Sequence, residues 1–205
     1  MNNALIARLS QQLQRYLPAG TEEFCARWLI VHNTSLRITR SRKTKLGDFL
    51  AQLPPAPHKI SVNGDLPPLQ FLITLTHEIA HAITWNRYQN RVASHGSEWK
   101  RCYQDLLAEL LRLEVLAGDE TLALKELYRK PTATSTLSYP IYKLTQSKDL
   151  GLLLDDLKPG QVFSLGDNKN FRTIKKLRSH WRCTELSSGR EYRVHGQVPV
   201  TIIEM

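Results

Sequence analysis

Residues 67–88 read PPLQFLITLTHEIAHAITWNRY, and this stretch decides how the rest of the chain is interpreted. The two prolines pre-set the opening turn of a helix, and the apolar residues after them continue to about Tyr88. We therefore expect one long helix here. Within it, His77, Glu78 and His81 have the spacing His-Glu-x-x-His, which places both imidazoles on one helix face, within reach of a single ion.

This spacing favours a zinc site. Neutral imidazoles four residues apart are good Zn²⁺ ligands, and the glutamate after the first can take a proton from water on the metal. Zinc lowers the pKa of that water toward about 7, so Glu78 could act as general base at neutral pH. Unrelated histidines on a solvated helix face are the plain alternative, but composition makes this set of offsets uncommon. We expect one Zn²⁺ per chain.

A catalytic zinc also needs a third protein ligand and an open position. The sequence SHGSEW at 94–99 offers two candidates. His95 follows a polar turn, and Gly96 lets the chain reverse toward the long helix. Glu98 is explained equally well by its place in the first turn of the next helix. We favour His95, with Cys102 left as a candidate fourth ligand, because closed structural sites usually have four.

The elements around this helix indicate an α+β domain over residues 1–130. The expected elements, in chain order, are helices over 3–17 and 21–29, strands over 36–39 and 58–64, the helix over 68–88, a helix that begins near Ser97, and a helix that Asp119 caps and that ends near Lys130.

A second, smaller domain is expected over residues 150–205. Residues 131–149 are rich in Thr and Ser and contain two prolines, which is typical of a linker. Five short β-like runs separated by turn clusters then follow, at 160–165, 171–177, 180–186, 190–195 and 198–204. Five strands in so few residues predict an all-β barrel or rolled sheet of the SH3 or OB kind.

Composition excludes several classes of protein. The 205 residues carry 28 Lys+Arg against 19 Asp+Glu, a net charge of +9, which permits a polyanionic partner without requiring one. A hydrophobic content of 41% excludes wholesale disorder, and no apolar run approaches the roughly 20 residues of a membrane helix. Three scattered cysteines exclude a disulfide scaffold and a Cys-x-x-Cys knuckle. With no signal-peptide pattern, we expect a cytoplasmic protein without membrane partners.

The sequence resembles the SprT-like metalloprotease domain, which is related to eukaryotic Spartan. The resemblance covers about residues 30–115 and rests on His77-Glu78-Ile79-Ala80-His81, a following Trp85, and His95-Gly96-x-x-Trp99-Lys100. It implies a zincin fold, with His77, His81 and His95 as zinc ligands and Glu78 as the general base. It also implies cleavage of DNA-associated or DNA-crosslinked proteins, with roles in DNA repair and stress response. Many SprT-like proteins continue into a Cys-rich zinc ribbon, which this chain lacks.

Two basic regions are candidates for contacts with DNA. The first contains Arg40, Arg42, Lys43 and Lys45, and its alternative is a solvated strand edge that discourages edge pairing. The second contains Lys175, Lys176, Arg178 and Arg182, interleaved with Phe171, Trp181 and Tyr192. Such interleaving suits a barrel on which bases stack. Its alternative is a small core of rings with the cations on its solvated face.

These patterns favour a zinc-dependent endopeptidase that acts on a protein substrate. The alternative from another class is a non-enzymatic nucleic-acid-binding or stress-response adaptor in which the zinc is structural. A zinc hydrolase acting on a non-protein amide is the third hypothesis, since it would need the same site.

Overall fold

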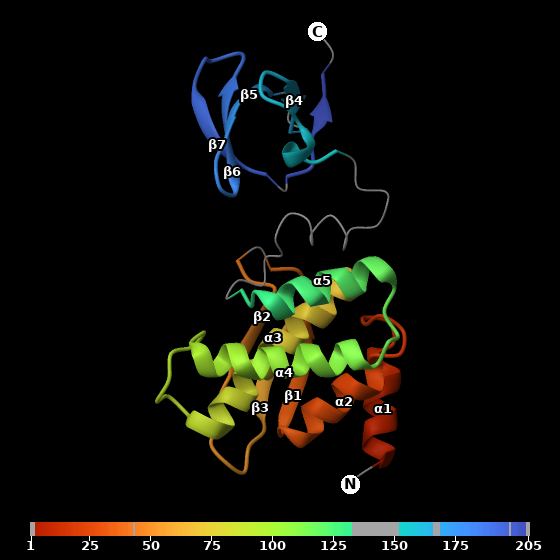
Figure 1. Ribbon diagram of the computed structural model, residues 1–205. Helices are drawn as coiled ribbons and strands as arrows, with labels where there is room; N and C mark the ends of the chain where they lie inside the picture. The colour runs from red at the N-terminus through yellow and green to blue at the C-terminus, as the bar shows by residue number, and fades with distance from the viewer. Residues whose placement is uncertain (1–2, 43, 133–151, 166–168, 197, 204–205) are drawn as a thin grey trace. The chain divides into compact units, whose positions relative to one another are not determined.

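The computed structural model describes residues 3–42, 44–132, 152–165, 169–196 and 198–203 (Figure 1). The chain divides into two compact units, Met1–Thr136 and Leu137–Met205, which are described separately. Helices and sheets are both present, so the expected α+β class is confirmed at that level. No described helix is both long and apolar enough to cross a membrane. Lys43 and residues 133–149 of the expected linker lie outside the described residues.

The first unit contains helices on one side of a small sheet. Its elements are α1 (Asn3–Leu13), α2 (Glu22–Val31), β1 (Thr34–Thr39), β2 (Gly47–Leu50), β3 (His58–Asn63), α3 (Pro68–Tyr88), α4 (Ser97–Arg112) and α5 (Gly118–Arg129).

Two predicted helix ends were wrong. α1 ends at Leu13 instead of continuing to residue 17, because the backbone N–H groups of Tyr16 and Leu17 both close onto the Leu13 carbonyl in a turn. Asp119 does not cap α5, which begins one residue earlier at Gly118. The carboxylate of Glu120 accepts the backbone N–H of Ala117 at 3.1 Å and supplies that capping interaction instead.

The sheet has the order β1-β3-β2. β1 pairs with β3 in parallel, from Thr34 opposite His58 to Thr39 opposite Asn63, and β2 pairs with β3 antiparallel. β2 was not predicted, because the four-residue sequence GDFL contains Gly and Asp, which are depleted in strands. In the described part of the chain, β2 pairs only with β3, so it is an edge strand.

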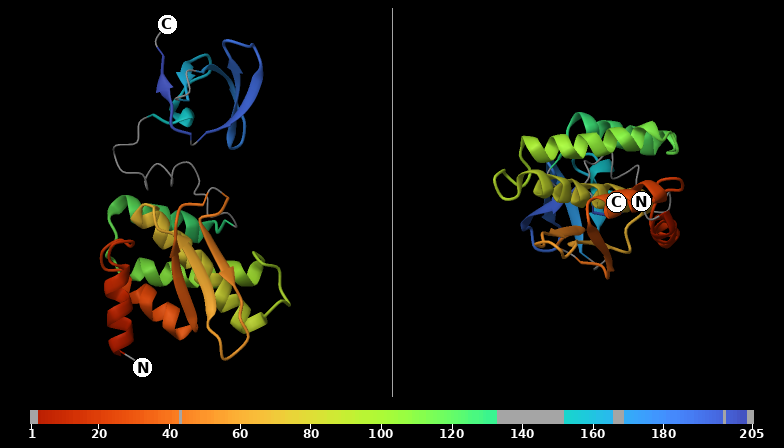
Figure 2. Two further views of the ribbon diagram at one scale, coloured as in Figure 1. Left: turned by 180° about the vertical axis from the view of Figure 1, so that it is seen from behind. Right: turned by 90° about the horizontal axis from the view of Figure 1, so that it is seen from below.

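α3 lies between the sheet and α4 (Figures 1 and 2). Contact on both sides explains why 15 of its 21 residues are buried. Thr74, Thr76 and Thr84 donate their hydroxyls to the backbone carbonyl four residues earlier, at 2.7–2.8 Å, so their polar groups are satisfied within the helix. His77 and Glu78 on the same helix are also buried, each 5% exposed.

The second unit is an antiparallel sheet with the order β7-β6-β5-β4-β8. Its elements are the 3₁₀ helix η1 (Leu154–Asp156), β4 (Val162–Ser164), β5 (Asn170–Lys176), β6 (His180–Glu185), β7 (Glu191–His195) and β8 (Thr201–Ile202). The five predicted strands are therefore present. No ladder joins β7 to β8 in the described residues, so they are the two edges of an open sheet. Phe163, Phe171 and Trp181 are buried in the core.

Candidate metal centre

The fold brings three histidines together. His77 and His81 lie on α3, and His95 lies just before α4. A turn closed by the Gly96 N–H on the Ala93 carbonyl, at 3.0 Å, returns the chain toward α3. Among the described residues, His77, His81 and His95 form the one group of three or more side chains that could hold a metal ion.

The geometry of this group suits one metal ion. Its three Nε2 atoms form a nearly equilateral triangle: 3.2 Å from His77 to His81, 3.1 Å from His81 to His95, and 3.2 Å from His95 to His77. Three nitrogens at about 2.0–2.1 Å from a tetrahedral zinc ion lie about 3.3 Å apart, close to these separations. The three histidines thus fit a tetrahedral metal centre, whose metal the geometry alone does not identify.

Trp99 packs against all three imidazoles. Its ring centroid lies 4.7 Å from those of His77 and His95 and 5.3 Å from that of His81. Tyr103 stacks on Trp99 at 5.0 Å and lies 5.9 Å from the His77 ring, and both Trp99 and Tyr103 are buried. α4 therefore supplies an aromatic wall that fixes the orientations of the ligands.

The surroundings keep the imidazoles neutral. Burial, and then the neighbouring imidazoles, lower the pKa of His77 to about 3 and that of His81 to about 4. Burial also lowers the pKa of His95. Neutral imidazole is the form that binds a metal ion, so the folded chain presents its ligands ready for binding.

Glu78 is a buried carboxylate beside the sheet. Burial, and then the charge of Asp48, raise its pKa to about 8, and the positive charges of Arg42 and Lys45 oppose this shift. A divalent cation in the histidine site would lower this pKa in turn. Glu78 makes no hydrogen bond to any residue that the structure describes, so its carboxylate is free to exchange a proton.

β2 packs directly on Glu78. A Cβ atom placed on Gly47 would lie 2.5 Å from Glu78 Oε1 and 2.7 Å from Thr74 Cγ2. Glycine at position 47 is what allows the edge strand to approach this closely. Sequence reasoning missed this contact, since a lone Gly-Asp pair gives no strand signal.

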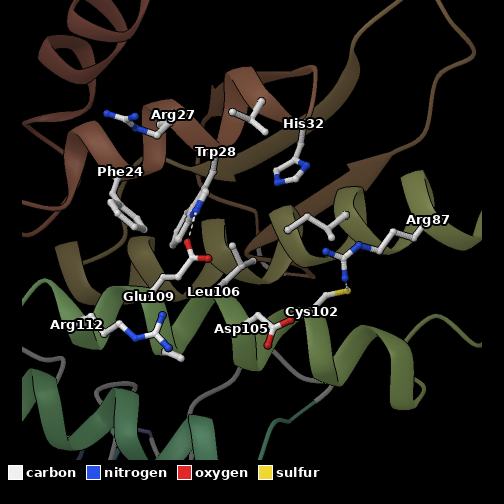
Figure 3. Close-up of a pocket in the computed structure, with 13 residues that line it drawn as sticks. Phe24, Arg27, Trp28, His32, Arg87, Cys102, Asp105, Leu106, Glu109 and Arg112 are labelled. Carbon is white, nitrogen blue, oxygen red and sulfur yellow. Dashed lines mark hydrogen bonds between the residues drawn. The ribbon is translucent and has the colours of Figure 1, made fainter. Parts of the chain in front are cut away.

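The two other candidate ligands lie elsewhere. Glu98 is half-buried, and its Oε2 accepts the Ser97 hydroxyl at 3.0 Å. The Cys102 sulfur faces Arg87 Nη1 at 3.7 Å and lines a cavity of about 430 Å³ between α2, α3 and α4 (Figure 3). Neither belongs to the histidine group. The described residues therefore supply three ligands and leave one coordination position open.

The cavity in Figure 3 contains charged side chains but no convergent set of metal ligands. The Glu109 carboxylate accepts the indole N–H of Trp28 at 3.1 Å, so one of the carboxylates that line the cavity is already hydrogen-bonded. Although this cavity is larger than the groove beside the histidines, it carries no candidate chemistry.

A groove of about 330 Å³ lies beside His81. The Phe49 ring is nearly parallel to that of His81, with centroids 6.2 Å apart, and Trp85 also lines the groove. The lining has no charged side chain: Phe49, Ala51, His81, Thr84, Trp85, Gln89, Asn90, Val92, Ala93 and Ser94. This groove is suited to an uncharged side chain.

The first basic region is partly engaged inside its unit. Arg42 donates from Nε to Asn63 Oδ1 at 2.8 Å and from Nη1 to Ser61 Oγ at 3.0 Å, which fastens the chain before β2 to β3. Lys45 pairs with Asp48 at 2.9 Å, while Arg40 is exposed. These contacts give Arg42 a structural role near the metal centre.

The second basic region is also divided. Lys175, Arg178 and Arg182 are exposed, whereas Lys176 pairs with the buried Asp155 at 3.0 Å. The aromatic residues Phe171 and Trp181 are core residues, so the plain alternative is correct for those two rings.

Comparisons with known proteins identify no relative of this chain. No family model matches the sequence, and neither a curated protein nor a solved structure gives a match. The SprT-like resemblance therefore stays a prediction, and the centre stands on its own residues: three convergent imidazoles, a buried neighbouring carboxylate and one open ligand position.

Proposed function

We propose that this chain is a zinc-dependent endopeptidase of the SprT-like type. The observation that carries the proposal is the triangle of Nε2 atoms, 3.1–3.2 Å on each side, next to a buried glutamate on the same helix. Imidazole also suits copper, iron and nickel. Zinc is favoured because three protein ligands, an open position and an adjacent carboxylate form the usual set of a hydrolytic zinc site.

Zinc, when bound, supplies a Lewis acid that polarises a water molecule and the scissile carbonyl. Glu78 accepts the proton that the attacking water loses and then delivers it to the nitrogen of the leaving amine. The carbon–nitrogen bond breaks, and the products are a carboxylate and an amine. Packing of β2 on Glu78 holds the carboxylate in position for both transfers. Positioned acid–base catalysis of this kind contributes about 10²–10⁴-fold in rate.

A peptide substrate is supported by the edge strand. β2 pairs only with β3 in the described residues, so its other edge can pair with an extended peptide laid along the metal centre. The uncharged groove beside His81 would then receive a side chain next to the scissile bond. That the substrates are DNA-associated proteins rests on the SprT-like resemblance.

The adaptor alternative requires a closed metal site. Closed structural zinc sites usually have four protein ligands. Cys102 and Glu98, the two candidates for a fourth, make their contacts elsewhere. This favours the peptidase over the adaptor.

Matched glutamate variants test the proposal. Glu78→Gln and Glu98→Gln remove the same charge from the buried position beside the histidines and from a half-buried position outside the histidine group. Each protein, with its zinc content measured, is incubated with a DNA-binding protein, with and without single-stranded DNA, and self-cleavage is followed in parallel. We expect Glu78→Gln to keep one zinc per chain and lose at least about 10²-fold in cleavage rate, and Glu98→Gln to cleave as wild type does.

Cleavage by Glu78→Gln at the wild-type rate would refute the assigned base. No cleavage by the zinc-loaded wild type under any of these conditions would instead support the adaptor. Stimulation by DNA would support the DNA-associated substrate class.

A further inference from the structure

The outer face of β5, β6 and β7 carries a row of cations. Lys175 on β5 lies directly opposite Arg182 on β6, which lies directly opposite Arg193 on β7. All three side chains are exposed, and residues 170–195 contain seven Lys and Arg against two Glu. Neighbouring strands are about 4.8 Å apart, so the row spans roughly 10 Å.

This row is unfavourable for folding. Like charges directly opposite each other on a sheet destabilise it. One ion pair relieves the repulsion: Arg182 Nε lies 3.5 Å from Glu191 Oε2, with both side chains about half exposed. An exposed pair of this kind contributes little. The buried Glu185 is occupied by Ser188 and Tyr192 and therefore does not neutralise the row.

We propose that this face, the cation row of Lys175, Arg182 and Arg193, binds the phosphate backbone of nucleic acid without reading base sequence. Arginine matches phosphate geometry through paired N–H donors. The next rows on the same face contain His180 opposite His195, and Arg172, Thr184 and Glu191. None of these paired side chains is apolar, and the exposed Leu177 and Leu186 follow β5 and β6 outside the paired rows. The paired rows therefore present charge to a partner and not an apolar surface to a lipid bilayer.

The burial of two aromatic rings indicates a preference for duplex over single-stranded nucleic acid. Phe171 and Trp181 are 5% and 3% exposed and pack inside the unit, so they cannot serve as stacking platforms for bases. Tyr192 is 39% exposed, but it alternates with Arg193 along β7 and so lies on the opposite face of the sheet from the cation row. Binding then depends on phosphate charge density, which is highest in the duplex. We expect a duplex to bind at least as tightly as a single strand of equal length. This inference does not rest on the peptidase proposal, because binding requires neither metal nor cleavage.

The test is fluorescence anisotropy with the full-length chain and a labelled 20-base-pair duplex, from 50 to 200 mM salt. The variant Lys175→Gln/Arg182→Gln/Arg193→Gln removes the row, and Lys158→Gln is the control, because Lys158 is exposed in the same unit but lies outside β5–β7. The affinity of the wild type falls with salt, and loss of three phosphate contacts should make the slope of log K against log salt shallower by about 2.7. The ratio of the wild-type affinity to that of the triple variant should therefore fall about 40-fold from 50 to 200 mM salt.

The unfolding temperature of each variant separates binding from folding. Removing opposed like charges should leave it unchanged or raise it. The single variant Arg193→Gln, expected to lower the slope by about 0.9, provides the same test if the triple variant unfolds. An unchanged slope in the triple variant, or an equal change in Lys158→Gln, would overturn the proposal. Binding to phosphatidylserine vesicles but not to the duplex would also overturn it.

Discussion

Replacing Gly47 with alanine should disturb Glu78 without altering a metal ligand. The new Cβ would lie 2.5 Å from Glu78 Oε1 and 2.7 Å from Thr74 Cγ2, where ordinary contacts begin at 3.4 Å. Either β2 or the Glu78 side chain must therefore move by about 1 Å. Overpacking of this kind costs about 1–3 kcal/mol, which corresponds to a fall of roughly 2–12 °C in unfolding temperature for a protein of this size. Misplacing a catalytic group by about 1 Å costs on the order of 10²-fold in rate.

The assay has three readouts: thermal unfolding by circular dichroism, zinc content, and cleavage rate. Gly118→Ala is the matched control, because nothing lies within 4 Å of a Cβ at the start of α5. We expect Gly47→Ala to lose stability and cleavage while it retains zinc, and Gly118→Ala to lose neither. A Gly47→Ala protein with wild-type stability and cleavage would show that β2 does not press on Glu78.

Three further results are expected. His95→Ala should weaken zinc binding by more than the 10–100-fold that loss of an outer-shell partner costs, whereas Glu98→Ala should not change it, as measured by competition with a chromophoric chelator. Free zinc at 100 times its Kd should stabilise the wild type by about 2.7 kcal/mol, and adding a chelator should reverse the resulting rise in unfolding temperature. Equal unfolding temperatures with zinc and with chelator would argue against a site formed only in the folded chain. The three cysteines are 0–2% exposed, and burial raises the pKa of Cys183 to about 11. A thiol reagent at pH 8 should therefore label the cysteines slowly in the native chain and quickly in guanidinium. Fast labelling of the native chain would contradict their burial.

The long helix and its pair of histidines were predictable because their signals are local. Two prolines, an unbroken apolar run and the His-Glu-x-x-His spacing all lie within residues 67–88, and α3 was observed over Pro68–Tyr88. His95 was also expected from sequence to return to this helix, since the turn before it lets the chain reverse. The convergence of its Nε2 atom on those of His77 and His81 agrees with that prediction.

The contacts around the site were not predictable from local pattern. β2 is only four residues long, and its strand character comes from pairing with β3 rather than from its own propensity. β1 and β3 pair in parallel although β2 lies between them in the chain, an arrangement that no short stretch of sequence encodes. In the second unit, alternation alone could not decide whether Phe171 and Trp181 face solvent or core, because a one-residue change of register exchanges the two faces.

The division of the three candidate metal ligands between two kinds of structure has a kinetic consequence. His77 and His81 belong to a helix buried between sheet and α4, whereas His95 lies in the connection between α3 and α4. Displacement of that connection would remove one ligand while the other two stayed in place. Metal exchange should therefore proceed through local opening and run faster than amide hydrogen exchange along α3, which needs the helix itself to unfold. The exchange rate of the bound metal would then report on residues 89–96, and not on the stability of the whole unit.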